Sequence, residues 1–283
     1  MAKKSMFRYC LVDAFTDSAF KGNPAAVCLL EEERAEEWML AVARELNAPV
    51  TCYLTRMPHG GDSNAEFRLR WFTTVREVKL CGHATLAASH FVFEQDLANS
   101  DTIRFSTMSR ILMSKRIPQN ASTFLIELDF PSIPLTECDE EDTPSILKSL
   151  NVTSVNHIYK TTTFEAFLIV VVGSSEAVVE VVPDFDEIRK LPCMGLIITG
   201  VAPAVSGFDF FTRIFAPVTG VDEDHVCGSA HCALVNYWSK QLGKHDFVAY
   251  QRSGVLNIHH DQENQRVLLR GDAVTIVEGS LFV

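Results

Sequence analysis

Short runs of β-branched and aromatic residues recur along the whole chain, and many of them alternate apolar with polar positions. A period of two is typical of half-buried strands. The chain therefore predicts strands at residues 7–15, 26–30, 51–55, 65–72, 102–105, 123–130, 164–172, 195–200, 208–215, 247–252, 266–271 and 273–278.

Fewer segments have the 3.6-residue period of a helix. Within residues 31–47, Trp38, Val42 and Leu46 fall near one face, and the opening acids suit the positive end of a helix dipole. Because the elements lack the regular alternation of strand and helix found in a doubly wound sheet, we expect an α+β fold. Further helices are predicted to begin at Gly82 and Gly228 and to cover 142–150 and 184–191.

Two segments of the chain, 67–93 and 208–238, are similar to each other. Each runs from an aromatic strand through a Cys-Gly turn into an apolar helix. The cysteines of these turns, Cys81 and Cys227, are 146 positions apart. That spacing is about half the chain, which is what a duplicated domain gives.

Length and composition also fit two domains. The chain has 283 residues, 47% of them apolar, which is enough for two cores of ordinary size. Pro131 and Pro134 interrupt the strand pattern near the middle. We therefore expect an N-terminal repeat domain at 1–130 with the first Cys-Gly turn, and a C-terminal repeat domain at 131–283 with the second. Whether the last strand returns to the first domain stays open.

Charge and hydropathy exclude several classes of partner. Acidic residues outnumber basic ones by 36 to 25, so the chain repels phosphate backbones and we expect no nucleic-acid partner. No run approaches the roughly 18 to 20 apolar residues of a membrane span, and the first residues lack a secretory pattern. We expect no membrane association and a cytoplasmic protein. Eight dispersed cysteines fit a reducing compartment.

The two Cys-Gly turns are the leading candidates for catalysis. Glycine permits tight backbone geometry, and the free amides of a helix's first turn bind a carboxylate without a charged side chain. The same amides favour a thiolate, so we expect lowered pKa values for Cys81 and Cys227. If the repeats face each other, one thiolate can remove an α-proton while the opposite thiol returns one, which is two-base racemisation.

Plainer interpretations of these residues stay open. Each cysteine could be a small residue packed beneath a helix start. His83 and Asp224 could be caps or turn formers as well as groups that orient substrate or tune the thiols. A zinc site is disfavoured, because Cys227, His231 and Cys232 lack the usual ligand spacing and the last two diverge on a helix. We expect no bound metal.

Five short motifs occur in order along the chain, at residues 13–16, 22–27, 77–85, 215–217 and 223–231. Together they make the chain resemble the phenazine-biosynthesis isomerase family (PhzF-like) over nearly its whole length. The resemblance implies the diaminopimelate-epimerase-like fold, in which two similar domains each wrap a curved mixed sheet around a central helix, with the active site in the cleft between them. It also implies a cofactor-independent enzyme of a family that is often dimeric, so a homodimer is a possible assembly.

The resemblance assigns roles to residues beside the two turns. His83, Asp224 and Ser229 match active-site positions of the phenazine enzymes, and the turns at Gly82 and Gly228 match those that bind the substrate carboxylate. We therefore expect these five residues to bind a small-molecule carboxylate.

Two positions depart from the family pattern. Val50 stands where the family has its catalytic glutamate, and a valine cannot transfer a proton. Cys227 stands where the family usually has threonine. With Cys81 it completes a cysteine pair similar to that of the diaminopimelate epimerases and proline racemases.

The leading hypothesis is therefore a cofactor-independent amino-acid racemase or epimerase with Cys81 and Cys227 as paired acid and base. An apolar amino acid is the expected substrate, because no cluster of arginines accompanies the Cys-Gly motifs. Two alternatives remain. One is a PhzF-like isomerase of a small cyclic or unsaturated carboxylic acid that uses Asp224 or His83, and the other is a catalytically silent binding protein.

Overall fold

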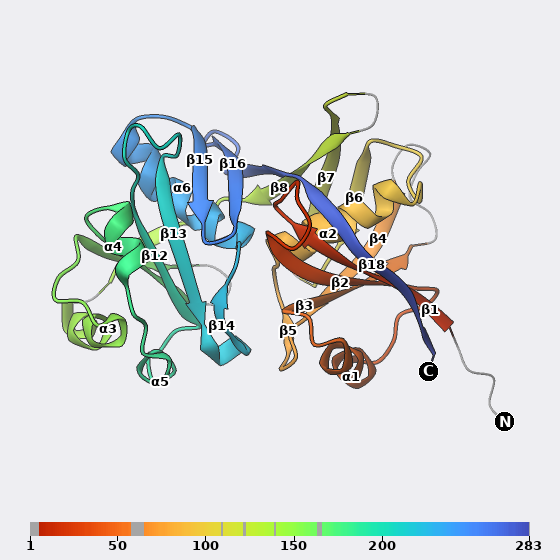
Figure 1. The fold of residues 1–283 in the computed structure, drawn as a ribbon, viewed down its shortest axis with the longest axis horizontal. Coiled ribbons are helices and arrows are strands. Elements are labelled where there is room, and N and C mark those ends of the chain that lie inside the picture. Colours follow the sequence, from red (N-terminus) through yellow and green to blue (C-terminus); the bar gives the residue numbers. More distant parts are fainter. Residues whose placement is uncertain are drawn as a thin grey trace. The chain divides into compact units, whose positions relative to one another are not determined.

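The structure, a computed structural model, describes residues 6–57, 65–108, 110–120, 123–138, 140–162 and 166–282. The chain divides into two compact units (Figure 1). Unit 1 comprises Met1–Asp129 and Arg270–Val283, and unit 2 comprises Phe130–Leu269. The expected boundary after residue 130 lies beside this division. The last strand belongs to unit 1, which the sequence analysis had left open.

Unit 1 is formed mainly by strands, with two helices described. Its elements are β1 (Met6–Ala14), β2 (Asn23–Leu30), α1 (Glu36–Leu46), β3 (Val50–Arg56), β4 (Ala65–Phe72), β5 (Glu77–Val78), α2 (Gly82–Glu94), β6 (Thr102–Ser106), β7 (Ile111–Pro118), β8 (Phe124–Pro131), which runs across the boundary, and β18 (Ala273–Phe282).

Unit 2 has the same character, with more short helices. Its elements are β9 (Leu135–Glu137), η1 (Glu140–Asp142), α3 (Thr143–Leu150), β10 (His157–Thr161), β11 (Phe167–Val171), α4 (Ser175–Glu180), α5 (Phe185–Ile188), β12 (Gly195–Val201), β13 (Phe210–Ala216), η2 (Pro217–Thr219), β14 (Val221–Asp224), α6 (Gly228–Leu242), β15 (Asp246–Gln251), β16 (Gly254–Asp261) and β17 (Arg266–Gly271), which also crosses the boundary.

Each of the twelve predicted strand segments overlaps a strand of the structure, although residues 164 and 165 of one segment lie outside the described residues. The strands β5, β7, β9, β10, β14 and β16 and helix α4 were not predicted. The helix expected at 31–47 begins later, at Glu36. Before it, Glu33 forms an ion pair with Arg70 of β4 at 3.2 Å, in a segment without helical structure.

The two units repeat one topology. In unit 1, β1–β2 is antiparallel, β2–β3 parallel, β3–β4 antiparallel, β4–β5 antiparallel, β4–β6 parallel and β6–β7 antiparallel. In unit 2 the same sequence of pairings occurs in β10–β11, β11–β12, β12–β13, β13–β14, β13–β15 and β15–β16. The helices α2 and α6 occupy corresponding places, directly after β5 and β14.

A buried helix lies at the centre of each unit. Every residue of α2 from Gly82 to Phe93 is buried, and the helix packs against β1, β2, β3, β7 and β18 (Figure 1). A helix that is apolar on all sides belongs in a core. In α6 most residues from Gly228 to Ser239 are buried as well. The α+β class and the expected sheet-around-helix architecture are confirmed.

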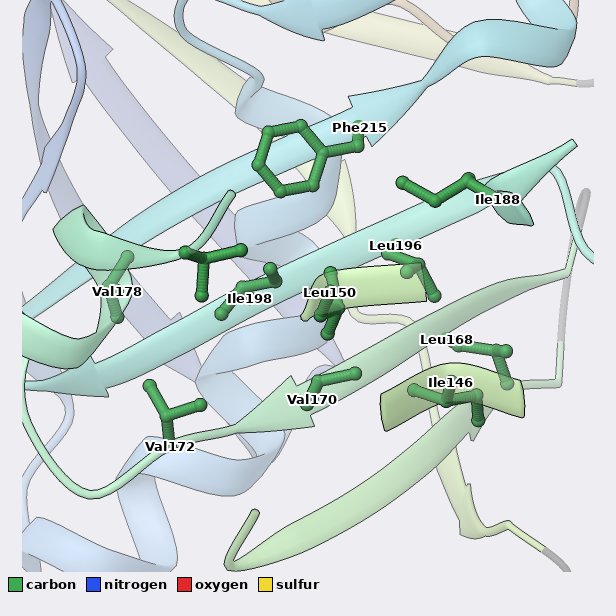
Figure 2. Close-up of a cluster of buried hydrophobic side chains, with 11 residues drawn as sticks. Ile146, Leu150, Leu168, Val170, Val172, Val178, Ile188, Leu196, Ile198 and Phe215 are labelled. Atoms are coloured by element: carbon green, nitrogen blue, oxygen red, sulfur yellow. The ribbon is translucent and has the colours of Figure 1, made fainter. Parts of the chain in front are cut away.

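Shorter helices cover the other faces of the sheets. In unit 1, Met39, Val42 and Ala43 of α1 pack on a cluster that includes Tyr53 and Phe72. In unit 2, Figure 2 shows side chains of β11 and β12 facing those of the surrounding helices. These buried layers include Phe72 of β4 and Phe215 of β13, the strands that pair with β5 and β14 before the two Cys-Gly turns.

Candidate active site

The first Cys-Gly turn caps the central helix of unit 1. Cys81 is the N-cap residue of α2, with extended backbone angles, and is only 7% exposed. Its Sγ lies 3.6 Å from Nδ1 of His83, which is also buried. The carbonyl of Cys81 accepts hydrogen bonds from the backbone amide of Thr85 at 3.2 Å and from its Oγ1 at 2.5 Å. The thiol is therefore held at the amide end of a buried helix.

The second turn has the same construction in unit 2. Cys227 is the N-cap of α6 and is partly buried. Its Sγ lies 3.3 Å from Oγ of Ser229, and its carbonyl accepts a hydrogen bond from Nδ1 of His231 at 2.8 Å. In both turns the residue two positions after the cysteine contacts the sulfur, and the residue four positions after it binds the cysteine carbonyl.

An ion pair fixes the strand that leads into each turn. In unit 1, Arg70 of β4 makes two hydrogen bonds to Glu77 of β5, at 2.8 and 2.7 Å. In unit 2, Arg213 of β13 makes two to Glu223 of β14, at 2.8 and 3.1 Å. Each glutamate lies four residues before its cysteine. Such bidentate pairs are geometrically specific, so they set the approach of β5 and β14 to the helix start.

Each arginine also lies over an aromatic ring two residues further along its strand. The guanidinium carbon of Arg70 is 5.2 Å from the ring centre of Phe72, and that of Arg213 is 4.9 Å from the ring centre of Phe215. These arginines and glutamates were not predicted. The signal was present in the repeat, because Arg-x-Phe and Glu-x-x-x-Cys occur in both copies.

His231 is a structural histidine. It is fully buried, and burial lowers its pKa to about 4. Its ring stacks on Phe210 with centres 5.9 Å apart. Because a carbonyl can only accept, Nδ1 carries the proton in the bond to Cys227. His231 is therefore neutral near pH 7 and holds the turn as a hydrogen-bond donor.

Several cysteines outside the turns are held as thiols. Burial raises the pKa of Cys28 to about 12 and that of Cys193 to about 11. It also raises the pKa values of Cys10 and Cys52. These four side chains stay protonated near neutral pH, so they are not candidates for a base. None of the eight cysteines, all of which lie in described segments, forms a disulfide.

The structure brings the predicted residues together in two groups. Cys81, Gly82 and His83 form the start of α2 in unit 1. Asp224, at the end of β14, lies just before the start of α6 in unit 2, where the other three predicted residues follow, Cys227, Gly228 and Ser229.

Two further residues bear on the chemistry. Val50 is the first residue of β3, is 5% exposed and pairs with Ala25 of β2, so the side chain at this position is apolar and buried. Gln251 of β15 was not predicted, yet its side chain bonds to the backbone of both Asp224 and Cys227. It lies 24 positions from the cysteine, and no local motif indicates it.

Within the described segments, no group of three or more His, Cys, Asp or Glu side chains is placed to hold a metal ion. The same segments include no helix with the length and apolar character needed to cross a bilayer. Each turn combines a thiol, a side chain that can donate to sulfur and the backbone amides of a helix start. This combination can stabilise a thiolate and bind an anion beside it.

Comparison with known proteins places the chain among similar sequences over almost its full length. Residues 12–279 match the model of the family described as phenazine biosynthesis-like protein. The chain is 38% identical to an uncharacterized isomerase of Halalkalibacterium halodurans, over 96% of this chain and 97% of the relative. It is 35% identical to the phenazine biosynthesis-like domain-containing protein 1 of Mus musculus, with the same coverage of both chains.

Solved structures agree with these matches. A PhzF family protein of Enterococcus faecalis superposes with a TM-score of 0.83 at 32% identity, covering 99% of this chain and all of the other. A hydroxyproline epimerase from Agrobacterium vitis, solved with bound trans-4-hydroxy-L-proline, gives a TM-score of 0.63 at 10% identity, covering 100% of this chain and 93% of the other. At that identity the second likeness shows a shared fold alone.

Proposed function

Because this chain belongs to the family of phenazine biosynthesis-like (PhzF-like) isomerases, we propose that it is a cofactor-independent isomerase that inverts the α-carbon of an amino acid. In this proposal Cys81 and Cys227 are the paired acid and base. The observation that carries it is the matched construction of the two turns, in which each cysteine caps the central helix of its unit.

The proposed reaction transfers one proton at each sulfur. A thiolate takes the α-proton, so a C–H bond breaks and an S–H bond forms. The opposite thiol then gives its proton to the other face of the carbanion, and its own S–H bond breaks. The two sulfurs end with exchanged protonation states. The mechanism requires that both thiols reach opposite faces of one α-carbon, and solvent exchange or the reverse reaction resets them.

The neighbouring groups support the two roles. Amides at Gly82 and Gly228 can bind the α-carboxylate and stabilise the enolate-like charge that develops as the proton leaves. His83 can donate to a thiolate at Cys81, and Ser229 can do so at Cys227, at the separations given above. The proposal assigns Asp224 to recognition of the substrate's amino group. With Val50 at the family's glutamate position, the thiols remain as the proton-transfer groups.

We extend the proposal to the substrate class, the oligomeric state and the compartment. The substrate is an apolar amino acid, the enzyme is a homodimer like many of its family, and it works in the cytoplasm. Eight cysteines without a disulfide are suited to a reducing compartment.

Incubation with pooled amino acids in deuterium oxide tests the reaction. Chiral chromatography with mass detection should find deuterium at the α-carbon of an amino acid with inverted configuration. Cys81→Ser and Cys227→Ser should each lower the rate by about 10² to 10⁴-fold. Cys193→Ser, which removes a cysteine outside the turns, is the matched control and should keep the wild-type rate. Undiminished turnover in both turn variants would refute the two-thiol mechanism.

A second candidate follows from the family positions of His83 and Asp224. It is a PhzF-like isomerase that moves a proton within a small cyclic or unsaturated carboxylic acid. Deuterium entering such an acid, with none at the α-carbon of any amino acid, would favour this reaction. His83→Asn and Asp224→Asn should then abolish exchange, whereas Cys227→Ser should not.

A further inference from the structure

A buried side-chain amide bonds to the turn before α6 at two points. Gln251, the last residue of β15, has no exposed surface. Its Nε2 donates to the carbonyl of Asp224 at 2.9 Å, and its Oε1 accepts from the backbone amide of Cys227 at 3.0 Å. One side chain thus joins the end of β14 to the first residue of the helix cap.

A second buried side chain holds the other side of the same cysteine. His231 donates to the carbonyl of Cys227 at 2.8 Å. The backbone N–H and C=O groups of Cys227 are therefore both hydrogen-bonded to buried side chains. Rotation about the two backbone dihedrals of this residue is restricted, and with it the direction of the Cα–Cβ bond. The sulfur is kept at Ser229 and at the amide end of α6.

A carboxamide is the group this position needs. It offers a donor and an acceptor at once, whereas a carboxylate only accepts and a thioether of similar size makes neither bond well. A glutamate at 251 would place a negative oxygen against the carbonyl of Asp224 and beside the thiol. Gln251 itself is anchored in the sheet, since it pairs with Thr212 of β13 and with Gly254 of β16.

We propose that Gln251 is the positioning residue of the Cys227 thiol. It holds the turn from Asp224 to Cys227 so that the sulfur stays where the helix amides and Ser229 favour the thiolate. Its two hydrogen bonds are to backbone atoms, so it acts on the reacting sulfur through the turn. The consequence for turnover rests on the proposed function, whereas the consequence for thiol reactivity does not.

The test compares Gln251→Glu and Gln251→Met with Gln262→Glu, which makes the same charge change at an exposed glutamine of unit 2. Iodoacetamide labelling of the native protein is followed by peptide mass spectrometry. The rate at Cys227 is divided by the rate at Cys81 in the same sample. The ratio should fall at least fivefold in both Gln251 variants, more in Gln251→Glu, and stay unchanged in Gln262→Glu.

Turnover supplies the second measurement. Gln251→Met should lower kcat for α-carbon exchange at least tenfold while KM stays within about twofold, because the substrate's own contacts remain. An unchanged labelling ratio in both Gln251 variants overturns the positioning role, whatever the turnover. If the wild type exchanges the α-proton of no amino acid, the proposed reaction is refuted. A lower ratio of Cys227 to Cys81 labelling in the Gln251 variants would still support the positioning role. Should Gln251→Glu not fold, Gln251→Met decides both measurements.

Discussion

Acid should destabilise unit 2 through one histidine. His231 is buried, and burial lowers its pKa to about 4 from an ordinary value of 6.5. An unfolded chain binds a proton at this residue below pH 6.5, whereas the folded unit does so only below about pH 4. Between these values the unfolded state holds more protons, so stability falls as pH falls.

The size of the effect follows from the two pKa values. At 1.36 kcal/mol for each pH unit that separates them, the full contribution is about 3 kcal/mol. Lowering the pH from 7 to 4.5 crosses most of the interval between the two pKa values, so the free energy of unfolding should fall by about 2 to 3 kcal/mol. His231→Phe removes the titrating group and keeps a ring against Phe210, so it should remove this part of the pH dependence.

Hydrogen exchange in peptides of α6 measures the opening free energy of unit 2 at the two pH values. His157→Gln, which removes an exposed histidine of β10 in the same unit, is the control and should keep the wild-type pH dependence. His260 is also in unit 2, and burial lowers its pKa as well, so the difference between wild type and variant is the decisive quantity. The same loss of stability in His231→Phe as in wild type would refute the reasoning.

Two further predictions concern the ion pairs before the two turns and one buried cysteine. Glu77→Gln and Glu223→Gln each remove the negative charge from the mostly buried partner of an arginine, Arg70 or Arg213. In urea titrations each variant should lower the unfolding free energy of its own unit by about 2 kcal/mol. Changes below about 0.5 kcal/mol in both variants would contradict a stabilising role for these ion pairs. Burial raises the pKa of Cys28 to about 12, so iodoacetamide should leave this thiol unlabelled in the native protein at pH 8 and label it in urea. Equal labelling rates in the native and the urea-unfolded protein would show that the thiol is not buried.

The sequence indicated those strands whose inward positions are apolar. It missed β16, where one inward position is polar. Strand β16 alternates buried and exposed residues, but one of its buried positions is His260. That side chain is stable there because its Nδ1 lies 2.7 Å from Oγ of Ser239 on α6, a partner 21 positions away. Periodicity cannot reveal a burial that depends on a distant hydrogen bond.

The candidate site was predictable to the extent that it is local. A Cys-Gly pair before an apolar helix is contiguous in sequence, and so are His83 and Ser229, two positions after the cysteines. The partners that hold the turns come from other strands. Gln251 reaches the turn from the end of β15, and the sheet's register decides that it does so.

Sequence by itself therefore determined the α+β class, the family, the repeat and the two cysteines that cap the central helices. Each of these depends on short-range patterns or on motifs kept in order. Tertiary structure alone decided which side chains hold those cysteines in place. Hydrogen bonds at about 3 Å require strands remote in sequence to be brought into register, and only the folded sheet supplies that register.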